Sequence, residues 1–341
     1  MNPASPALPN RKLFTLAFVA VLILGAYFRG DGLFRGLERN VIYHPDSPKQ
    51  VLMLRSYLQG NYLQYYDSRY TDGYPFGLNR VDELIIRIAQ QVIRPVQAWL
   101  DPDTPVPWMP TTAALFAWGR VLRVLYGLMV IGLIYAALRR FGAGPWTSLL
   151  GGLVYALAPL GSTVTHAVTG DIGVDLFLAL VVWCLAGYAG SGKRVWLILG
   201  GFSVGMAYAC KYQGGLGLWM PGLAVLLGVQ PGWAAVRVWF ARGAMVIGGF
   251  LVGMLAGSPA FYYDASKAWK NVRINYAFIK DFGAPAEILQ LPLIKRIHYG
   301  LFNNVPLVLE SVGWVLSLLA MVALAHVLRA WWKAWRGPDE D

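Results

Sequence analysis

The sequence predicts an all-α protein that crosses a membrane several times. Of its 341 residues, 57% are hydrophobic and 14% are charged, and its mean hydropathy is +0.48. Soluble domains carry about 25% charged residues. Several apolar runs also approach the roughly 20 residues that a helix needs to cross a bilayer. These observations predict a polytopic bundle of about eight transmembrane helices.

The first apolar run follows Arg11 and Lys12. No small-residue cleavage site precedes Arg29, so an uncleaved span is expected rather than a signal peptide. The fifth and sixth runs are short and rich in glycine, and they are expected to tilt or break. The eight candidate spans are Leu13–Phe28, Thr112–Leu138, Trp146–Thr165, Ile172–Ala189, Val195–Ala209, Leu216–Val229, Gly243–Tyr262 and Pro306–Leu328.

Basic residues recur at alternate ends of successive spans, which the positive-inside rule makes cytoplasmic. The basic residues behind the net charge of +11 are therefore expected to set the orientation in the membrane. Nucleic-acid binding is disfavoured, because the sequence has no basic face with interleaved aromatic residues outside the membrane segments. Cys184 and Cys210 fall inside apolar runs and are predicted to be core residues. The basic positions are Arg11-Lys12, Arg139-Arg140, Lys193-Arg194, Arg237/Arg242 and Arg329/Lys333/Arg336.

The spans and this orientation divide the chain into five parts. They are the N-terminus and first span (1–28), a long outer loop (29–111), spans two to seven (112–262), a second outer loop (263–305), and the last span with a cytoplasmic tail (306–341). In the long loop, Ser47–Leu58 and Asn79–Leu100 have apolar residues at helical spacing. They are predicted to be amphipathic helices on the membrane surface; a small cap packed against the bundle is the alternative.

Ionisable residues at membrane depth indicate function by default, because they are costly there. Asp171 and Asp175 open the fourth span four residues apart, which places them on one helical face. Helix capping is the alternative for Asp171, but it does not account for Asp175. Arg120, Lys211 and Tyr212 are predicted at the same outer rim, where cations suit a phosphate-bearing ligand. Arg123 lies there too, and snorkelling to the interface is its alternative interpretation.

The first outer loop adds His44 and Asp46 to this rim, in the stretch YHPDSPKQ. Asp46 is expected at the start of the Ser47–Leu58 helix, where a carboxylate is favoured. With His166 and Asp171, these residues could instead hold a divalent cation such as Mg²⁺ or Mn²⁺, although nothing in the sequence fixes the geometry. The glycine pairs at 151–152, 200–201 and 248–249 are predicted to allow close helix packing in the bilayer.

These motifs, taken in order, resemble a family of membrane glycosyltransferases. An aspartate follows the first span, Gly119-Arg120 opens the second, and Tyr135 and Arg139-Arg140 end it. His166 to Asp171 precedes the fourth span, and Lys211-Tyr212 follows the fifth. The stretch GSPAFYYD, Gly257–Asp264, completes the set. Together these motifs resemble the GT-C-fold membrane glycosyltransferases of the protein O-mannosyltransferase and lipid A aminoarabinose-transferase type, which are similar to glycosyltransferase family 39. The resemblance covers roughly Arg29–Asp264.

The resemblance implies transfer of a sugar from a polyprenyl-phosphate donor to a lipid, glycan or protein acceptor at the outer face of the membrane. The expected location is a bacterial inner membrane with the site facing the periplasm, and partner subunits are an open question. By resemblance, Asp46 corresponds to the catalytic base, Asp171 to a second acid, and Arg120 and Lys211 to residues near the lipid phosphate. These assignments name no cofactor, and a divalent cation, Mg²⁺ or Mn²⁺, is the candidate.

Two departures from the family pattern favour an alternative. The family usually has Asp-Glu in the first motif, whereas this chain has Asp46-Ser47. With 341 residues the chain is also short for the family. A non-catalytic GT-C-like protein that binds lipid phosphate or scaffolds a complex is therefore the second hypothesis. A transporter is disfavoured, because the polar groups gather at one rim rather than at the midplane.

Overall fold

The structure is a computed structural model, and it describes residues 11–31, 47–62, 77–100, 109–158, 165, 167–227 and 233–283, with isolated positions 292 and 295. The chain divides into two compact units, Met1–Tyr276 and Ala277–Asp341. All contacts discussed below lie within the first unit. Over the described residues the regular structure is helical throughout, which confirms the predicted all-α class.

The described elements follow one another as helices joined by short connections. They are α1 (Arg11–Gly30), α2 (Ser47–Leu58), α3 (Gly77–Leu100), α4 (Thr112–Arg140), α5 (Pro145–Leu157), α7 (Asp171–Ser191), α8 (Val195–Cys210), the 3₁₀ helix η1 (Tyr212–Leu218), α9 (Trp219–Leu227), α10 (Trp233–Gly257), α11 (Ala260–Tyr263) and α12 (Ala265–Gly283).

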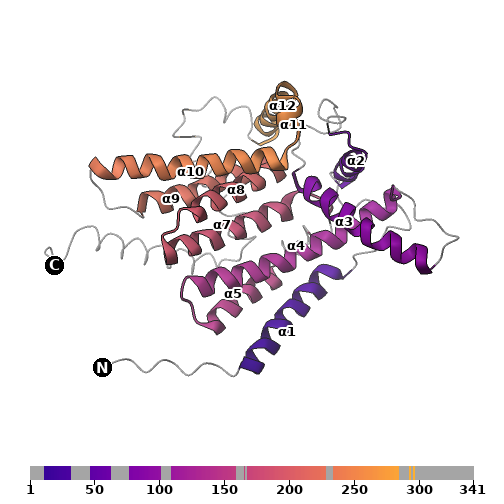
Figure 1. The fold of residues 1–341 in the computed structure, drawn as a ribbon, viewed down its shortest axis with the longest axis horizontal. Helices are drawn as coiled ribbons and strands as arrows, with labels where there is room; N and C mark the ends of the chain where they lie inside the picture. The colour runs from indigo at the N-terminus through magenta and orange to yellow at the C-terminus, as the bar shows by residue number, and fades with distance from the viewer. Residues whose placement is uncertain are drawn as a thin grey trace. The chain divides into compact units, whose positions relative to one another are not determined.

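The long helices pack as a series of neighbours (Figure 1). Helix α8 lies between α10 and α7, and α4 lies between α7 and the pair α1 and α5. A main apolar core joins α2, α3, α4, α7 and α8 around Leu54, Leu78, Leu122 and Ile172. This core lies directly beneath the ends of α7 and α8 that carry the predicted rim residues.

Among the described residues, four helices are long and apolar enough to span a membrane: Lys12–Gly30, Thr112–Arg140, Asp171–Ser191 and Val236–Gly257. The chain is therefore an integral membrane protein, but the count of eight spans is not confirmed. Helix α5 ends at Leu157 rather than at the expected Thr165. The predicted sixth span breaks into η1 and α9, and α8 is a shorter apolar helix. The last candidate span, Pro306–Leu328, lies outside the described residues.

The predicted seventh span, Gly243–Tyr262, was misplaced. Helix α10 begins ten residues earlier, at Trp233, and ends at Gly257. A turn at Ser258 and Pro259 then leads into the short helix α11. Proline has no backbone N–H to donate to the preceding turn of a helix, so the chain changes direction at Pro259.

Helix α2 is buried in the protein, although it was predicted to lie on the membrane surface. Helix α2 has the predicted bounds, but it does not lie on a surface: most of its residues are buried, including the polar Gln50 and Ser56. Its Met53 and Tyr57 pack against Ala260 and Ala268 of α11 and α12. The surface prediction was therefore wrong for α2, and the alternative of a cap packed against the bundle describes it better.

Two of the predicted cytoplasmic arginines, Arg140 and Arg242, contact aromatic residues of α7 and α8. The Arg140 guanidinium at the end of α4 lies 4.4 Å from the ring centroid of Trp183 on α7 and 4.2 Å from that of Trp196 on α8. The Arg242 side chain of α10 donates a hydrogen bond of 2.6 Å to Tyr188 Oη. Cation–π contacts of this kind hold arginine against aromatic faces. The predicted rim residues belong to the opposite ends of α7 and α8.

Helix α12 begins next to this opposite end, after the GSPAFYYD stretch. The Asp264 carboxylate accepts hydrogen bonds from Ser266 Oγ at 2.8 Å and from the Lys267 amide at 3.1 Å, as an N-cap residue does. The Ser266 bond, followed by the Lys267 amide bond, lowers the pKa of Asp264 below its usual value. The aspartate of this motif therefore starts a helix.

Candidate functional site

The candidate site lies where the first turn of α7 meets the end of α8. The Lys211 ammonium and the Asp171 carboxylate form an ion pair with an Nζ–Oδ1 distance of 2.5 Å, and their side chains are 30% and 32% exposed. Lys211 adopts an extended conformation that ends α8. The sequence predicted these two residues on one rim, and the structure places them in direct contact.

Backbone atoms bring the two helix ends this close. A Cβ atom added to Gly170 would lie 2.4 Å from the Cys210 carbonyl oxygen, and one added to Gly77 would lie 2.6 Å from the carbonyl carbon of Ala209. Real Cβ atoms do not approach backbone atoms so closely, so only glycine fits at both positions. The starts of α3 and α7 thus rest on Ala209 and Cys210, the two residues before Lys211.

Asp171 is the first residue of α7, whereas the N-cap position belongs to Gly170. Its carboxylate binds Lys211 across the rim. Asp175 lies one turn further along α7 and accepts a hydrogen bond of 2.9 Å from Tyr155 Oη. The Tyr155 ring in turn lies 5.0 Å from the guanidinium of Arg29. The two aspartates therefore have separate partners, and capping alone does not describe Asp171.

Ser47 connects the first outer loop to this rim. Its hydroxyl accepts a hydrogen bond of 3.1 Å from the Val168 amide, three residues before Asp171. Asp46, the residue that precedes Ser47, lies outside the described residues, as do His44 and His166. The contact nevertheless attaches the start of α2 to the turn that leads into α7.

Tyr212 directly follows Lys211 and begins η1. Its hydroxyl accepts a hydrogen bond of 3.3 Å from Asn271 Nδ2 of α12, and its ring lies 5.1 Å from that of Tyr208. Helix α12 belongs to a segment predicted as the second outer loop, and this bond attaches it to the rim. Among the described residues, no group of three His, Cys, Asp or Glu side chains could hold a metal ion.

The second span supplies the two arginines, and both are buried. Arg120 is 4% exposed and follows Gly119, which packs against Val168. Arg123 is fully buried and donates from Nε to the Thr169 carbonyl at 3.3 Å. Snorkelling to the interface therefore does not describe Arg123. The bond to the Thr169 carbonyl places Arg123 beneath the turn that leads to Asp171.

Sequence reasoning missed the partner of Arg123. Asp82 of α3 is fully buried and forms an ion pair with the Arg123 guanidinium, and it accepts a hydrogen bond of 2.7 Å from Tyr126 Oη. This triad of Asp82, Arg123 and Tyr126 joins α3 to α4 beneath the turn at Thr169. The available signal was the spacing of Arg123 and Tyr126, which puts a cation and a hydroxyl on one face of α4.

Comparison with known proteins supports the resemblance. Residues 115–263 match the family model described as dolichyl-phosphate-mannose-protein mannosyltransferase. The matched segment runs from α4 through α11 and includes Arg120, Asp171, Asp175, Lys211 and Tyr212. No curated protein matches the chain significantly. The resemblance to GT-C membrane glycosyltransferases, expected from the order of the motifs, is confirmed by the family match.

One solved structure that matches is that of the S. cerevisiae protein O-mannosyltransferase Pmt1-Pmt2 complex bound to the sugar donor. The match has a TM-score of 0.49 and 17% sequence identity, and it covers 75% of this chain. The same match covers 34% of the yeast chain, so this protein spans about a third of that relative.

Proposed function

We propose that this protein is a membrane glycosyltransferase that moves a sugar from a polyprenyl-phosphate donor to an acceptor hydroxyl at the outer face of the membrane. The observation that carries the proposal is the partly exposed Lys211–Asp171 pair, set at the turn to which Ser47, the neighbour of Asp46, is hydrogen-bonded. The family match over residues 115–263 supports the reaction class.

Each residue has one role in the proposed step. The acceptor oxygen attacks the anomeric carbon of the sugar, and the bond from that carbon to the phosphate oxygen breaks. Asp46 takes the proton of the acceptor hydroxyl, as a general base positioned by the start of α2. The leaving polyprenyl phosphate gains negative charge, which Lys211 stabilises as a preorganised cation.

The Lys211 ammonium has the Asp171 carboxylate as its partner, so we propose that donor binding is an exchange of partners. The phosphate replaces Asp171 as the partner of the ammonium, and the buried Arg120 adds positive charge behind the rim. Tyr212, held by Asn271, lies next to Lys211 and is the proposed hydroxyl donor to the phosphate. This exchange keeps the lysine oriented before the donor arrives.

The Asp46→Asn variant tests the catalytic role. The amide cannot accept the proton, so sugar transfer by the purified protein should fall by about a hundredfold or more. Transfer from a polyprenyl-phosphate sugar is followed by mass spectrometry of the products. Asp31→Asn, the same change at an exposed residue after α1, is the control and should retain activity. Full activity of Asp46→Asn would remove Asp46 as the base.

Lys211→Met tests the phosphate role separately from proton transfer. Loss of the ammonium should weaken donor-lipid binding by at least about tenfold, since charge-assisted bonds to phosphate contribute about 1.5–3 kcal/mol. Binding is measured with the donor lipid and no acceptor, so the result does not depend on Asp46. Unchanged donor binding would refute the phosphate role, and binding without any transfer in the wild-type protein would favour the lipid-phosphate-binding alternative.

A further inference from the structure

Helix α3 has an apolar stripe, from Leu84 to Trp99, that no described element covers. Leu84, Ile88, Val92, Val96 and Trp99 recur at intervals of three or four residues and are all exposed, Trp99 to 80%. Helix α3 is not among the candidate spans. In an integral membrane protein, a helix with such a stripe lies in the plane of the interface with its apolar face among the acyl chains. Its polar flank is then at headgroup depth.

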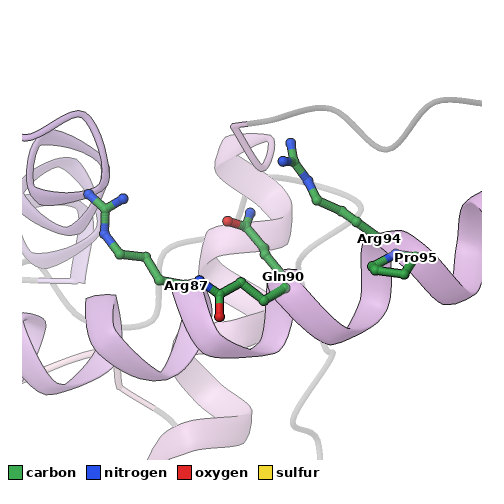
Figure 2. A pocket seen from close by; sticks show the side chains of 5 residues that line it. Arg87, Gln90, Arg94 and Pro95 are labelled. Carbon is green, nitrogen blue, oxygen red and sulfur yellow. The ribbon is translucent and has the colours of Figure 1, made fainter.

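A pocket opens on this polar flank. It has a volume of about 280 Å³ and is lined by Arg87, Gln90, Gln91, Arg94 and Pro95. Figure 2 shows the side chains of Arg87, Gln90 and Arg94 extending from the same side of α3. Two arginine and two glutamine side chains thus line the pocket beside the ring of Pro95, and the described lining contains no acidic residue.

The charges around the pocket leave it positive. Asp82 is neutralised by Arg123 inside the protein, so Glu83 is the remaining acid of α3. Glu83 pairs with Arg80 and with Arg87 Nε, the latter at 2.9 Å. Arg80, Arg87 and Arg94 thus share one carboxylate, that of Glu83, whose ion pairs are with Arg80 and Arg87. The Arg87 Nη2 also donates to the Tyr57 and Leu58 carbonyls at 3.2 and 3.0 Å, which fixes the guanidinium at the pocket.

We infer that this pocket binds the phosphodiester headgroup of an anionic phospholipid. Guanidinium groups are suited to phosphate oxygens because they present several N–H donors in one plane. The glutamine amides can bond the rest of a polar headgroup, and the adjacent apolar stripe accommodates its acyl chains. The pocket is distinct from the rim, because Arg87 and Arg94 lie roughly 15 to 25 Å along the helix from Gly77.

The test uses the full chain in detergent, with bound lipid counted by native mass spectrometry. Wild-type protein should retain phosphatidylglycerol in preference to phosphatidylcholine. An R87Q/R94Q variant should bind phosphatidylglycerol about thirtyfold more weakly, since each cation near an anionic lipid contributes about fivefold. The R194Q/R237Q variant removes two exposed cations elsewhere and should bind like wild type.

Two further arms make the result decisive. R94Q alone leaves the Arg87 bonds to Glu83 and α2 in place, so an affinity loss of about fivefold in this variant supports the site without a change in folding. Displacement by inorganic phosphate would assign recognition to the phosphate group itself, and no displacement would assign it to the intact lipid. A preference for phosphatidylglycerol that survives R87Q/R94Q, or is lost equally in R194Q/R237Q, would overturn the inference.

Discussion

Replacing Arg123 with methionine is expected to destabilise the protein by about 3–5 kcal/mol, because it leaves the Asp82 carboxylate charged and unpaired inside the protein. Both side chains of this ion pair are 0% exposed, so water cannot replace the guanidinium. The midpoint of thermal unfolding in detergent, followed by tryptophan fluorescence, measures the effect. A midpoint equal to that of wild type would show that the pair does not hold α3 against α4.

The D82L/R123M double variant is the matched control. Replacing a whole buried pair with apolar residues of similar volume is often neutral or stabilising, so the double variant should recover most of the stability lost in R123M. Tyr126 loses its acceptor on Asp82 in this variant, and adding Y126F removes the resulting cost of about 1–3 kcal/mol. Failure of both combinations to recover stability would assign the loss in R123M to packing rather than to charge.

The same pair connects stability to the rim. Arg123 also bonds the Thr169 carbonyl, two residues before Asp171. R123K keeps a positive charge opposite Asp82, but an ammonium cannot place several N–H donors in one plane. This variant should therefore keep the ion pair with Asp82 and lose the hydrogen bond to the Thr169 carbonyl.

The sequence predicted the helices better than it predicted their surroundings. Helix α2 has the bounds that its periodicity indicated, yet it lies inside a protein core. An amphipathic pattern reports which residues avoid water, and it does not distinguish lipid from protein as the apolar neighbour. Helix α3 shows both cases: Leu78 and Ile86 are buried in protein, while Ile88 and Val92 are exposed.

The rim was predictable where it depended on topology. Asp171 and Lys211 lie at the same ends of adjacent spans, so the alternation of basic loops was enough to place them together. Asp82 was not predictable in the same way. It lies on a helix with several charged residues, any of which could face solvent, and its partner is 41 residues away. Burial of one particular carboxylate depends on how α3 packs against α4, which the pattern of a single helix does not contain.

The glycine pairs were also predicted only in part. Close helix packing was expected for 200–201 and 248–249, but only one glycine of each pair meets the neighbouring backbone. A Cβ atom on Gly201 would lie 2.1 Å from Val246 O, and one on Gly249 would lie 2.2 Å from Ile198 O. Gly200 and Gly248 have no atom closer than 3.8 Å. Helical spacing explains the difference, since consecutive residues point about 100° apart.

Gly249→Ala is therefore expected to destabilise the α8–α10 contact, while Gly248→Ala is not. The new methyl group of Gly249→Ala meets backbone atoms, which cannot rotate away, so the helices must separate; overpacking of this kind costs about 1–3 kcal/mol. In Gly248→Ala nothing lies within 4 Å of the new atom. That variant should be neutral or more stable by about 0.5–1 kcal/mol, because alanine favours the helix.

A stronger version combines Gly249→Ala with Gly253→Ala, since a Cβ atom on Gly253 would lie 2.0 Å from Phe202 O. Gly249 and Gly253 are four residues apart and form the small-xxx-small pattern of close membrane helix packing. Thermal unfolding in detergent should rank the variants from Gly248→Ala, through Gly249→Ala, to the double variant. Because the two sites share one contact, the double loss should be smaller than the sum of the single losses. Equal midpoints for Gly248→Ala and Gly249→Ala would contradict the close approach of α8 and α10.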